Sequence, residues 1–247
     1  MAAGYAANRP AVHPLVLDRL RTWQAGAPVA LAVDVGCGAG LSTRPITSLA
    51  RHAVGFDPAE SMVRMAQRVV PTCAFLTAAG EAMPFADGTV NLLTAAGSLN
   101  YTRDLDAVWA EAARVLVPGG ALAVYDFAPG RAFADDEALD AWFTAFTTRY
   151  PYPHRQAIPL SPAILAERAT GFRITRGEDF ALPLALTPEF YLGYMLTETN
   201  VQHATRRGTA LDDIRSWCAT TLAAVFDERP RPVVFHGYLV TLAPLGQ

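Results

Sequence analysis

The sequence predicts an α/β fold in which helices cover both faces of a mostly parallel sheet. Two observations lead to this prediction. Short apolar runs alternate with segments of helical spacing between residues 11 and 127, and a turn of closely spaced glycines follows the first of those runs. Strands that alternate with helices are typical of a parallel sheet covered on both faces.

The elements of the first half follow in order. Residues 11–25 place apolar side chains at the i, i+3, i+4 spacing of an amphipathic helix. Pro58 can open a later helix, because proline is well tolerated in a first turn. Beyond residue 25 we expect strands over residues 30–35, 54–57, 73–77, 90–96 and 121–127, and helices over residues 41–51, 58–69 and 104–116.

The second half changes rhythm after Phe127. Residues 129–159 are rich in aromatic side chains and begin with helical spacing. The segments between the later strands are too long for simple connections in a compact α/β unit. We expect them to form a helical lid over the carboxyl edge of the sheet, where open α/β sheets bind ligands. The expected elements are helices over residues 162–170, 188–203 and 212–226 and strands over residues 172–180 and 233–242.

Composition and charge exclude several classes of protein. Arginines are scattered along a chain of formal net charge −3, which disfavours a nucleic-acid partner. No segment resembles a signal peptide or the ~20-residue apolar span that a membrane requires. Three cysteines without paired spacing indicate neither a disulfide framework nor a metal site. We therefore expect a soluble cytoplasmic protein with no membrane partner, and either a monomer or a homodimer fits it.

The glycine turn is the first candidate site. Gly36, Gly38 and Gly40 read G-x-G-x-G, whereas the dinucleotide fingerprint is G-x-G-x-x-G. Asp34, two residues before the first glycine, would repel a pyrophosphate and attract a cation. The turn therefore favours a cationic ligand without phosphate that needs close approach of the backbone, which glycine allows because it has no Cβ. A purely structural turn is the alternative.

Asp57 is the second candidate. It ends the second predicted strand 17 residues after Gly40, near the ~20-residue spacing at which an acidic side chain meets a ribose diol. The alternative is that Asp57 only caps the helix that begins at Pro58.

Four motifs stand in order along the chain: VDVGCGAG, GFDPAESM, GEAMPFADGTVNLL and LDAVWAEAARVLVPGGALAVYDF. In this order they resemble those of the class I S-adenosylmethionine-dependent methyltransferases, in the small-molecule branch called the type 11 methyltransferase domain. The resemblance covers residues 5–127 and returns in YLGYMLTETNV and VVFHGYLVTL. It implies a Rossmann-like sheet of seven strands, the last inserted antiparallel, with S-adenosyl-L-methionine across the carboxyl ends of the first four.

The resemblance implies a single methyltransferase domain over residues 1–247. Its expected parts are an N-terminal segment and helix (1–27), the cofactor-binding core (28–127), lid insertions that bind substrate (128–160 and 183–230) and the remaining core elements (161–182 and 231–247).

Cofactor-binding roles follow from the resemblance, residue by residue. Asp34 would order the ammonium group of the cofactor, Asp57 would bind its ribose hydroxyls, and Arg9 would hold its carboxylate, a task suited to a guanidinium fork. A solvated Arg9 ahead of a helix is the alternative. Ala79 departs from the family, which often has Asp there. The other expected contacts are Tyr5, Gly36, Cys37, Gly38, Gly40, Ala96 and Gly97 at the methionine part, and Pro58, Met62, Gly80, Glu81 and Met83 at the adenine.

The acceptor side is less specific. Asn100 and Tyr101 follow the fourth strand, near the expected methyl group, and either would orient an acceptor or satisfy loop backbone. His203 is a further candidate base, although a lone histidine is more often structural. Candidate substrate contacts are His13, Trp142, Phe146, Tyr191, Tyr194 and Glu198, with packing in a core, or interhelix bonding for Glu198, as the alternative.

These features predict a methyltransferase that converts S-adenosylmethionine to S-adenosylhomocysteine and acts on a small molecule. We expect O-methylation of a phenolic or polyketide-like metabolite or a small carboxylic acid, and a quinone precursor also fits. The alternatives are a non-methylating cyclase or lyase on the same scaffold, a non-catalytic partner subunit and, more weakly, an NAD-dependent oxidoreductase.

Overall fold

A computed structural model describes residues 7–24, 26–153 and 159–246. The chain divides into two compact units. The sheet unit comprises Ala11–Phe127, Ala157–Phe180 and Gly237–Gln247. The helical unit comprises Met1–Pro10, Ala128–Gln156 and Ala181–His236.

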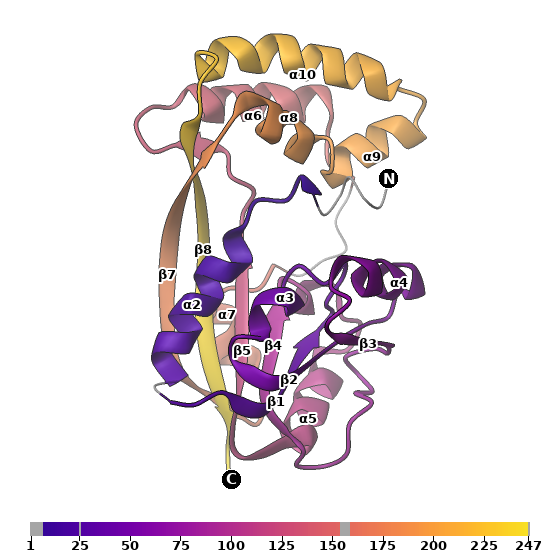
Figure 1. Cartoon of the computed structure of the whole chain (residues 1–247), viewed down its shortest axis with the longest axis vertical. Coiled ribbons are helices and arrows are strands. Elements are labelled where there is room, and N and C mark those ends of the chain that lie inside the picture. The colour runs from indigo at the N-terminus through magenta and orange to yellow at the C-terminus, as the bar shows by residue number, and fades with distance from the viewer. Residues whose placement is uncertain (1–6, 25, 154–158, 247) are drawn as a thin grey trace. The chain divides into compact units, whose positions relative to one another are not determined.

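The sheet has the order β3-β2-β1-β4-β5-β8-β6, and β7 also pairs with β8 (Figure 1). The first five strands are parallel, and β8 runs antiparallel to β5. The Rossmann-like, mostly parallel sheet with an antiparallel last strand is therefore confirmed. The strands are β1 (Val29–Val35), β2 (Ala50–Asp57), β3 (Ala74–Thr77), β4 (Val90–Ala96), β5 (Leu116–Phe127), β6 (Ala132–Phe133), β7 (Phe172–Leu186) and β8 (Arg231–Pro244). The sheet has eight strands instead of seven because the short β6 also pairs with β8.

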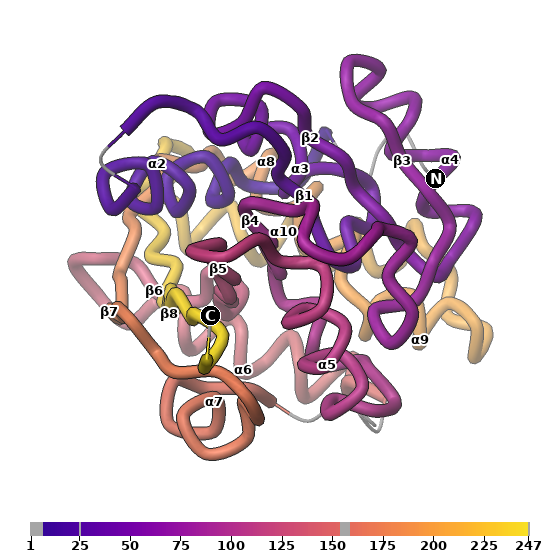
Figure 2. Tube along the Cα trace, turned by 90° about the horizontal axis from the view of Figure 1, so that it is seen from below, coloured from indigo at the N-terminus to yellow at the C-terminus, as the bar shows by residue number. Residues whose placement is uncertain are grey.

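Helices cover both faces of the sheet. Figure 2 shows α2 (Val12–Gln24) and α3 (Thr43–Ile46) on one face, and α5 (Leu105–Val115) and α7 (Pro162–Arg168) on the other. The side chains of α5 and α7 join those of β1, β4 and β5 in one buried apolar cluster. A smaller cluster joins α4 (Glu60–Val69) to the region around Cys37 and Phe75. These layers hold the carboxyl ends of β1, β2 and β4 next to one another.

Two helix predictions are wrong in length. The helix expected over residues 41–51 ends at Ile46, because the N–H groups of Ser48 and Leu49 bond to carbonyls three residues back and the chain enters β2 at Ala50. The helix expected over residues 188–203 is two helices, α8 (Pro188–Met195) and α9 (Thr199–Arg206), since Glu198 has extended backbone with φ −69° and ψ 150°.

The helical unit has an aromatic core. Its helices α6 (Ala138–Arg149), α8 and α10 (Leu211–Phe226) pack against one another (Figure 1). Trp142 of α6 stacks on Phe146, with ring centroids 5.1 Å apart, and on Trp217 of α10, with centroids 5.8 Å apart. The Tyr191 hydroxyl of α8 donates to the Gly130 carbonyl at 2.7 Å.

Within the described residues, every helix is too short or too polar to cross a bilayer. In the same residues, no three His, Cys, Asp or Glu side chains gather as a metal ion would require.

Candidate cofactor and acceptor site

Asp34 lies beneath the glycine turn, where its carboxylate is almost fully buried with 1% of the residue exposed. The strand register places it beside Thr94 of β4. Three hydroxyl groups donate to it: those of Ser42 at 2.6 Å and Thr43 at 2.7 Å, and that of Thr94 at 2.8 Å. Burial raises the pKa of Asp34, and the three hydroxyls partly offset this effect. Asp34 thus ties β1, β4 and the start of α3 together.

The glycines of the turn have different reasons to be glycine. All three have positive φ: 67° at Gly36, 52° at Gly38 and 82° at Gly40, a conformation that side chains with a Cβ rarely adopt. A Cβ on Gly36 would lie 2.4 Å from the Cβ of Ser98, and one on Gly40 would lie 3.1 Å from Phe75. A Cβ on Gly38 would meet no atom within 4 Å. Gly38 therefore presents bare backbone to open space, whereas Gly36 and Gly40 allow close packing.

Asp57 joins the end of β2 to this turn. One carboxylate oxygen accepts from the Gly38 N–H at 3.0 Å, and the other accepts from the Ala59 N–H at 2.8 Å. The alternative role of Asp57 as a helix cap is thus met in part, because Ala59 is the N-cap residue of α4. A carboxylate has about four acceptor positions, so these two bonds leave capacity for ligand hydroxyls.

A cavity of about 1040 Å³ opens at the carboxyl ends of β1, β2 and β4, entirely within the sheet unit. Its lining residues are Val35, Gly36, Gly38, Asp57, Pro58, Ala59, Met62, Ala79, Gly80, Glu81, Ala96, Gly97, Ser98, Leu99, Tyr101, Thr102 and Arg103. Most of the residues expected to bind the cofactor, from four separate segments of the chain, therefore line one space.

The wall that includes Ala79 and Gly80 offers no side-chain acceptor at position 79. The nearby Glu81 carboxylate accepts from the backbone N–H groups of Arg103 at 2.9 Å and Asp104 at 3.4 Å. Met83 is buried in the apolar cluster under α5 and does not line the cavity, so its expected packing on adenine is wrong. The predicted contacts to adenine would therefore rest on Met62 and on the backbone of residues 79–81.

Tyr101, which was predicted to lie near an acceptor, lines the cavity. It lies on the short 3-10 turn Leu99–Tyr101 and is 68% exposed. Its neighbour Asn100 does not line the cavity. The Asn100 amide donates to Asp126 at 2.8 Å, and its carbonyl oxygen accepts from the Leu160 N–H at 3.2 Å. The structure favours the structural alternative for Asn100.

Four other residues of the sheet unit that were expected to bind a ligand lie outside the cavity lining. The Asp34 carboxylate is bonded to three hydroxyls. Its predicted influence on the ammonium group of the cofactor would therefore come from its charge and not from direct contact. The Cys37 side chain packs in the cluster with α4, and Gly40 packs against Phe75, which corrects their expected ligand contacts. His13 Nδ1 lies 2.9 Å from the buried Tyr125 hydroxyl, a pairing that fits a structural histidine.

In the helical unit, Glu198 and Arg9 form a partly buried ion pair. Glu198 is only 6% exposed, and its two carboxylate oxygens accept from Arg9 at 3.2 Å and from the Tyr152 hydroxyl at 3.0 Å. The Arg9 guanidinium also lies over the Tyr194 ring, 5.3 Å from its centroid. These contacts join Glu198 to two other segments of the chain, as the second alternative for this residue expected.

The aromatic residues expected to contact substrate are buried in the core of the helical unit. Trp142, Phe146, Tyr191 and Tyr194 are each at most 5% exposed, which favours the core alternative. His203 lies on α9 of the same unit. Tyr5 falls outside the described residues. Ligand contacts of these residues stay predictions.

Sequence reasoning missed several lining residues. They are Val35, Ala59, Ser98, Leu99, Thr102 and Arg103. Ser98 had the clearest signal, because it directly follows the Ala96–Gly97 pair. Its hydroxyl donates to the Val35 carbonyl at 2.5 Å and so fixes the loop after β4 to the end of β1.

The groups that line the cavity fit S-adenosylmethionine. Gly38 leaves open backbone, Asp57 offers acceptors for ribose hydroxyls, and Met62 supplies an apolar surface for a base. No cluster of basic side chains for a pyrophosphate lines the cavity: Arg103 is the lone cation among its lining residues, with Asp57 and Glu81 as anions.

Comparison with known proteins matches part of the chain to a family model. Residues 33–124 match the family model described as a methyltransferase domain. Demethylmenaquinone methyltransferase of Renibacterium salmoninarum is 28% identical over 120 residues, which are 46% of this chain and 51% of that protein. Sterol 4-C-methyltransferase of Caenorhabditis elegans is 32% identical over 100 residues, 38% of this chain and 30% of that protein. The chain thus matches about half or less of the length of these curated relatives.

Solved structures share the fold over nearly the whole chain. A candidate type II methyltransferase from Anaeromyxobacter dehalogenans has a TM-score of 0.71 at 23% identity, covering 90% of this chain and 94% of that one. A geranyl diphosphate methyltransferase in complex with S-adenosylmethionine has a TM-score of 0.53 at 17% identity, covering 95% and 85%. The [4+2]-cyclase SpnF has a TM-score of 0.54 at 21% identity, covering 93% and 82%.

Proposed function

We propose that this chain, whose residues 33–124 form a class I S-adenosylmethionine-dependent methyltransferase domain, transfers a methyl group to a small-molecule acceptor. The observation that carries the proposal is the shared cavity, which joins Gly38 and Asp57 to the exposed ring of Tyr101. Relatives named for demethylmenaquinone, a sterol and geranyl diphosphate support a small acceptor.

The residues of the cavity have separable tasks. Asp57 would bind the ribose hydroxyls, with its carboxylate held in place by the Gly38 and Ala59 N–H groups. Gly38 would allow the methionine part to approach the backbone, and Met62 with the backbone of Gly80 would contact the adenine. The bound cofactor supplies an electrophilic methyl group on a sulfonium, for in-line displacement by an acceptor.

The chain must then align the acceptor and exclude water, since displacement depends mostly on orientation. Tyr101 would orient an acceptor oxygen from the mouth of the cavity, because its ring lines the cavity and remains largely exposed. We infer O-methylation, with a phenolic or polyketide-like metabolite or a small carboxylic acid as acceptor. A carboxylate needs no base, whereas a phenol or an alcohol does.

Turnover with methyl-labelled S-adenosylmethionine tests this function. The purified chain would be incubated with separate panels of phenols, quinols and carboxylic acids, and mass spectrometry would follow both S-adenosylhomocysteine and labelled product. We expect both to form with at least one panel, and neither to form with the Asp57→Ala variant. Cofactor binding without S-adenosylhomocysteine in any panel would contradict methyl transfer and favour a non-methylating enzyme on this scaffold.

A further inference from the structure

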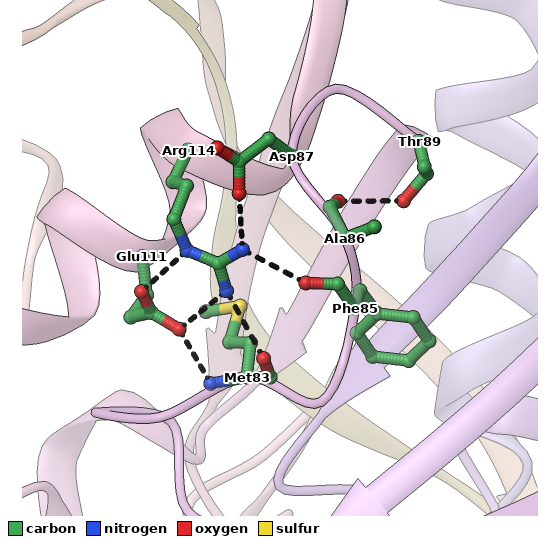
Figure 3. A network of polar contacts seen from close by, with 7 residues as sticks. All are labelled: Met83, Phe85, Ala86, Asp87, Thr89, Glu111 and Arg114. Carbon is green, nitrogen blue, oxygen red and sulfur yellow. Dashed lines mark hydrogen bonds and ion pairs between the residues drawn. The ribbon is translucent and has the colours of Figure 1, made fainter.

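Arg114 and Glu111 of α5 contact a neighbouring segment that has little structure of its own. Residues 78–89, which follow β3, form neither helix nor strand. Backbone groups in such a segment need hydrogen-bond partners from elsewhere. Figure 3 shows the Arg114 guanidinium surrounded by this segment on one side and by Glu111 on the other.

The contacts between α5 and the segment are numerous. Arg114 donates to the carbonyls of Phe85 at 2.8 Å and Met83 at 3.1 Å, and to the Asp87 carboxylate at 2.7 Å (Figure 3). Glu111 accepts from the Met83 N–H at 2.7 Å. Arg114 also donates to both Glu111 oxygens at 2.7 Å. The Arg114 bonds lower the pKa of Glu111, which keeps the pair ionised.

The same segment supplies one wall of the cavity. Ala79, Gly80 and Glu81 line the cavity, and Met83 comes only two residues later. The Ala82 N–H bonds back to the Ala79 carbonyl at 3.2 Å, so a shift of the chain at Met83 would be passed on to the wall.

The wall is attached to α5 at other points as well. A Cβ on Gly80 would lie 3.3 Å from the Val108 side chain of α5, which leaves little room between the Gly80 backbone and that side chain. Glu81 accepts from the N–H groups of Arg103 and Asp104, immediately before α5 begins. Helix α5 thus holds both ends of residues 80–87, and Arg114 with Glu111 forms the larger of the two attachments.

We propose that Arg114 and Glu111 are positioning residues for the nucleoside end of the cofactor, acting by fixing the Ala79–Glu81 wall of the cavity against α5. This inference rests on the proposed function, because it assumes that the cavity binds S-adenosylmethionine. Exposed ion pairs usually contribute little to stability. This pair differs because both partners also bond to the backbone of a binding segment.

The test measures the dissociation constant of S-adenosylhomocysteine by calorimetry, with circular dichroism to check the fold. Three variants are compared with wild type: Arg114→Ala, the double exchange Glu111→Arg with Arg114→Glu, and Arg21→Ala. Arg21 pairs with Asp18 at the same i, i+3 spacing on α2, at 3.2 Å, and neither residue lines the cavity. It therefore serves as the matched control.

We expect Arg114→Ala to weaken binding roughly fivefold or more, the scale of one net hydrogen bond, and Arg21→Ala to leave it unchanged. The double exchange keeps an ion pair on α5 but reverses its donors and acceptors toward Met83 and Phe85, so we expect it to stay as weak as Arg114→Ala. Glu111→Gln, which keeps the shape of the side chain, should shift binding in the same direction and serves if Arg114→Ala does not fold.

Wild-type affinity in Arg114→Ala or Glu111→Gln would overturn the positioning role, and so would full recovery in the double exchange, because the pair would then serve only α5. Each of these results requires that wild type binds the ligand. Failure of wild type itself to bind would instead overturn the proposed function, and the positioning role with it.

Discussion

The Asp57 carboxylate accepts a hydrogen bond of 3.0 Å from the Gly38 N–H, and this contact joins the end of β2 to the glycine turn after β1. Both residues line the same cavity. A carboxylate fixed by backbone donors is pre-organised, so it binds ligand hydroxyls without first losing side-chain freedom. This pair is therefore the centre of the proposed cofactor site.

Asp57→Asn should weaken binding of S-adenosylhomocysteine at least tenfold. An amide has one acceptor oxygen in place of two, and hydrogen bonds to a charged group contribute about 1.5–3 kcal/mol. Calorimetric titration measures the effect. The control is Asp18→Asn, an exposed position on α2, for which we expect wild-type affinity. Equal affinity of the two variants would remove Asp57 from the site.

Gly36→Ala and Gly38→Ala should separate stability from binding. Both backbones are left-handed, which costs a residue with a Cβ about 1–2 kcal/mol. Alanine at position 36 would also collide with Ser98. Such overpacking typically lowers stability by a further amount of about 1–3 kcal/mol. We expect urea denaturation to show the larger loss of unfolding free energy for Gly36→Ala. Gly38→Ala should mainly lose cofactor affinity, because its Cβ points into open space that a ligand needs.

A similar loss of stability in both glycine variants, with unchanged affinity in Gly38→Ala, would mean that the whole turn is structural. That was the alternative for the motif at the level of sequence.

Asp34 should make stability depend on pH in a defined direction. Burial raises its pKa in the folded state, so the folded protein holds this proton more tightly than the unfolded chain, whose pKa is about 3.9. Stability from this group therefore falls as the pH rises from the unfolded value through the raised folded value. Asp34→Asn should remove this part of the dependence.

The measurement is the unfolding free energy of wild type and Asp34→Asn at several pH values from acid to neutral. Subtracting one protein's unfolding free energy from the other's isolates the contribution of Asp34. Groups such as Glu111, whose pKa is lowered, change stability with pH in the opposite direction and cancel in this difference. Parallel curves would contradict the prediction.

Asp34→Ala should lower the free energy of unfolding by at least ~2 kcal/mol, because it removes the acceptor of three hydroxyls from Ser42, Thr43 and Thr94.

Tyr101→Phe should lower kcat more than it raises KM once an acceptor is known. The ring remains in place, and only the hydroxyl that would orient the acceptor oxygen is lost. Steady-state kinetics with Tyr101→Phe and Tyr101→Ala distinguish the two contributions. A change in KM alone would assign Tyr101 to acceptor binding, and normal kinetics in both variants would exclude it from the site.

Arg9→Ala should weaken binding of S-adenosylhomocysteine at least tenfold if the guanidinium holds the methionine carboxylate, at about the strength of a charged hydrogen bond. Glu198→Gln removes the partner of Arg9 in the helical unit and should leave that affinity near wild type. An unchanged dissociation constant in Arg9→Ala would exclude Arg9 from cofactor binding and leave it a structural role through its contacts with Glu198 and Tyr194.

The part of the cavity lined by the glycine turn and Asp57 was largely predictable because its signals are local. A strand, a glycine turn and an acidic residue at the next strand end are each written in a few consecutive residues, and parallel topology brings strand ends together. The hydrogen-bond partners of the Asp34 carboxylate were not predictable in this way. It depends on hydroxyls from β4 and from the turn before α3, which only the register of the sheet places around one carboxylate.

The acceptor side was predictable only in part. Tyr101 lines the cavity as expected, whereas Asn100 bonds to Asp126 and Leu160 instead. Trp142 and Tyr191 are core residues of the helical unit. Periodicity shows that an aromatic residue is on an apolar face, but the same spacing serves a core and a ligand pocket equally well.

Calorimetric titration of the purified chain with S-adenosylmethionine, then with S-adenosylhomocysteine and with NAD as the control, tests the cofactor assignment most directly. We predict micromolar binding of the first two ligands and none of NAD, because Asp57 and the open backbone at Gly38 suit a phosphate-free nucleoside. Binding of NAD, or failure of both S-adenosyl ligands to bind, would contradict it.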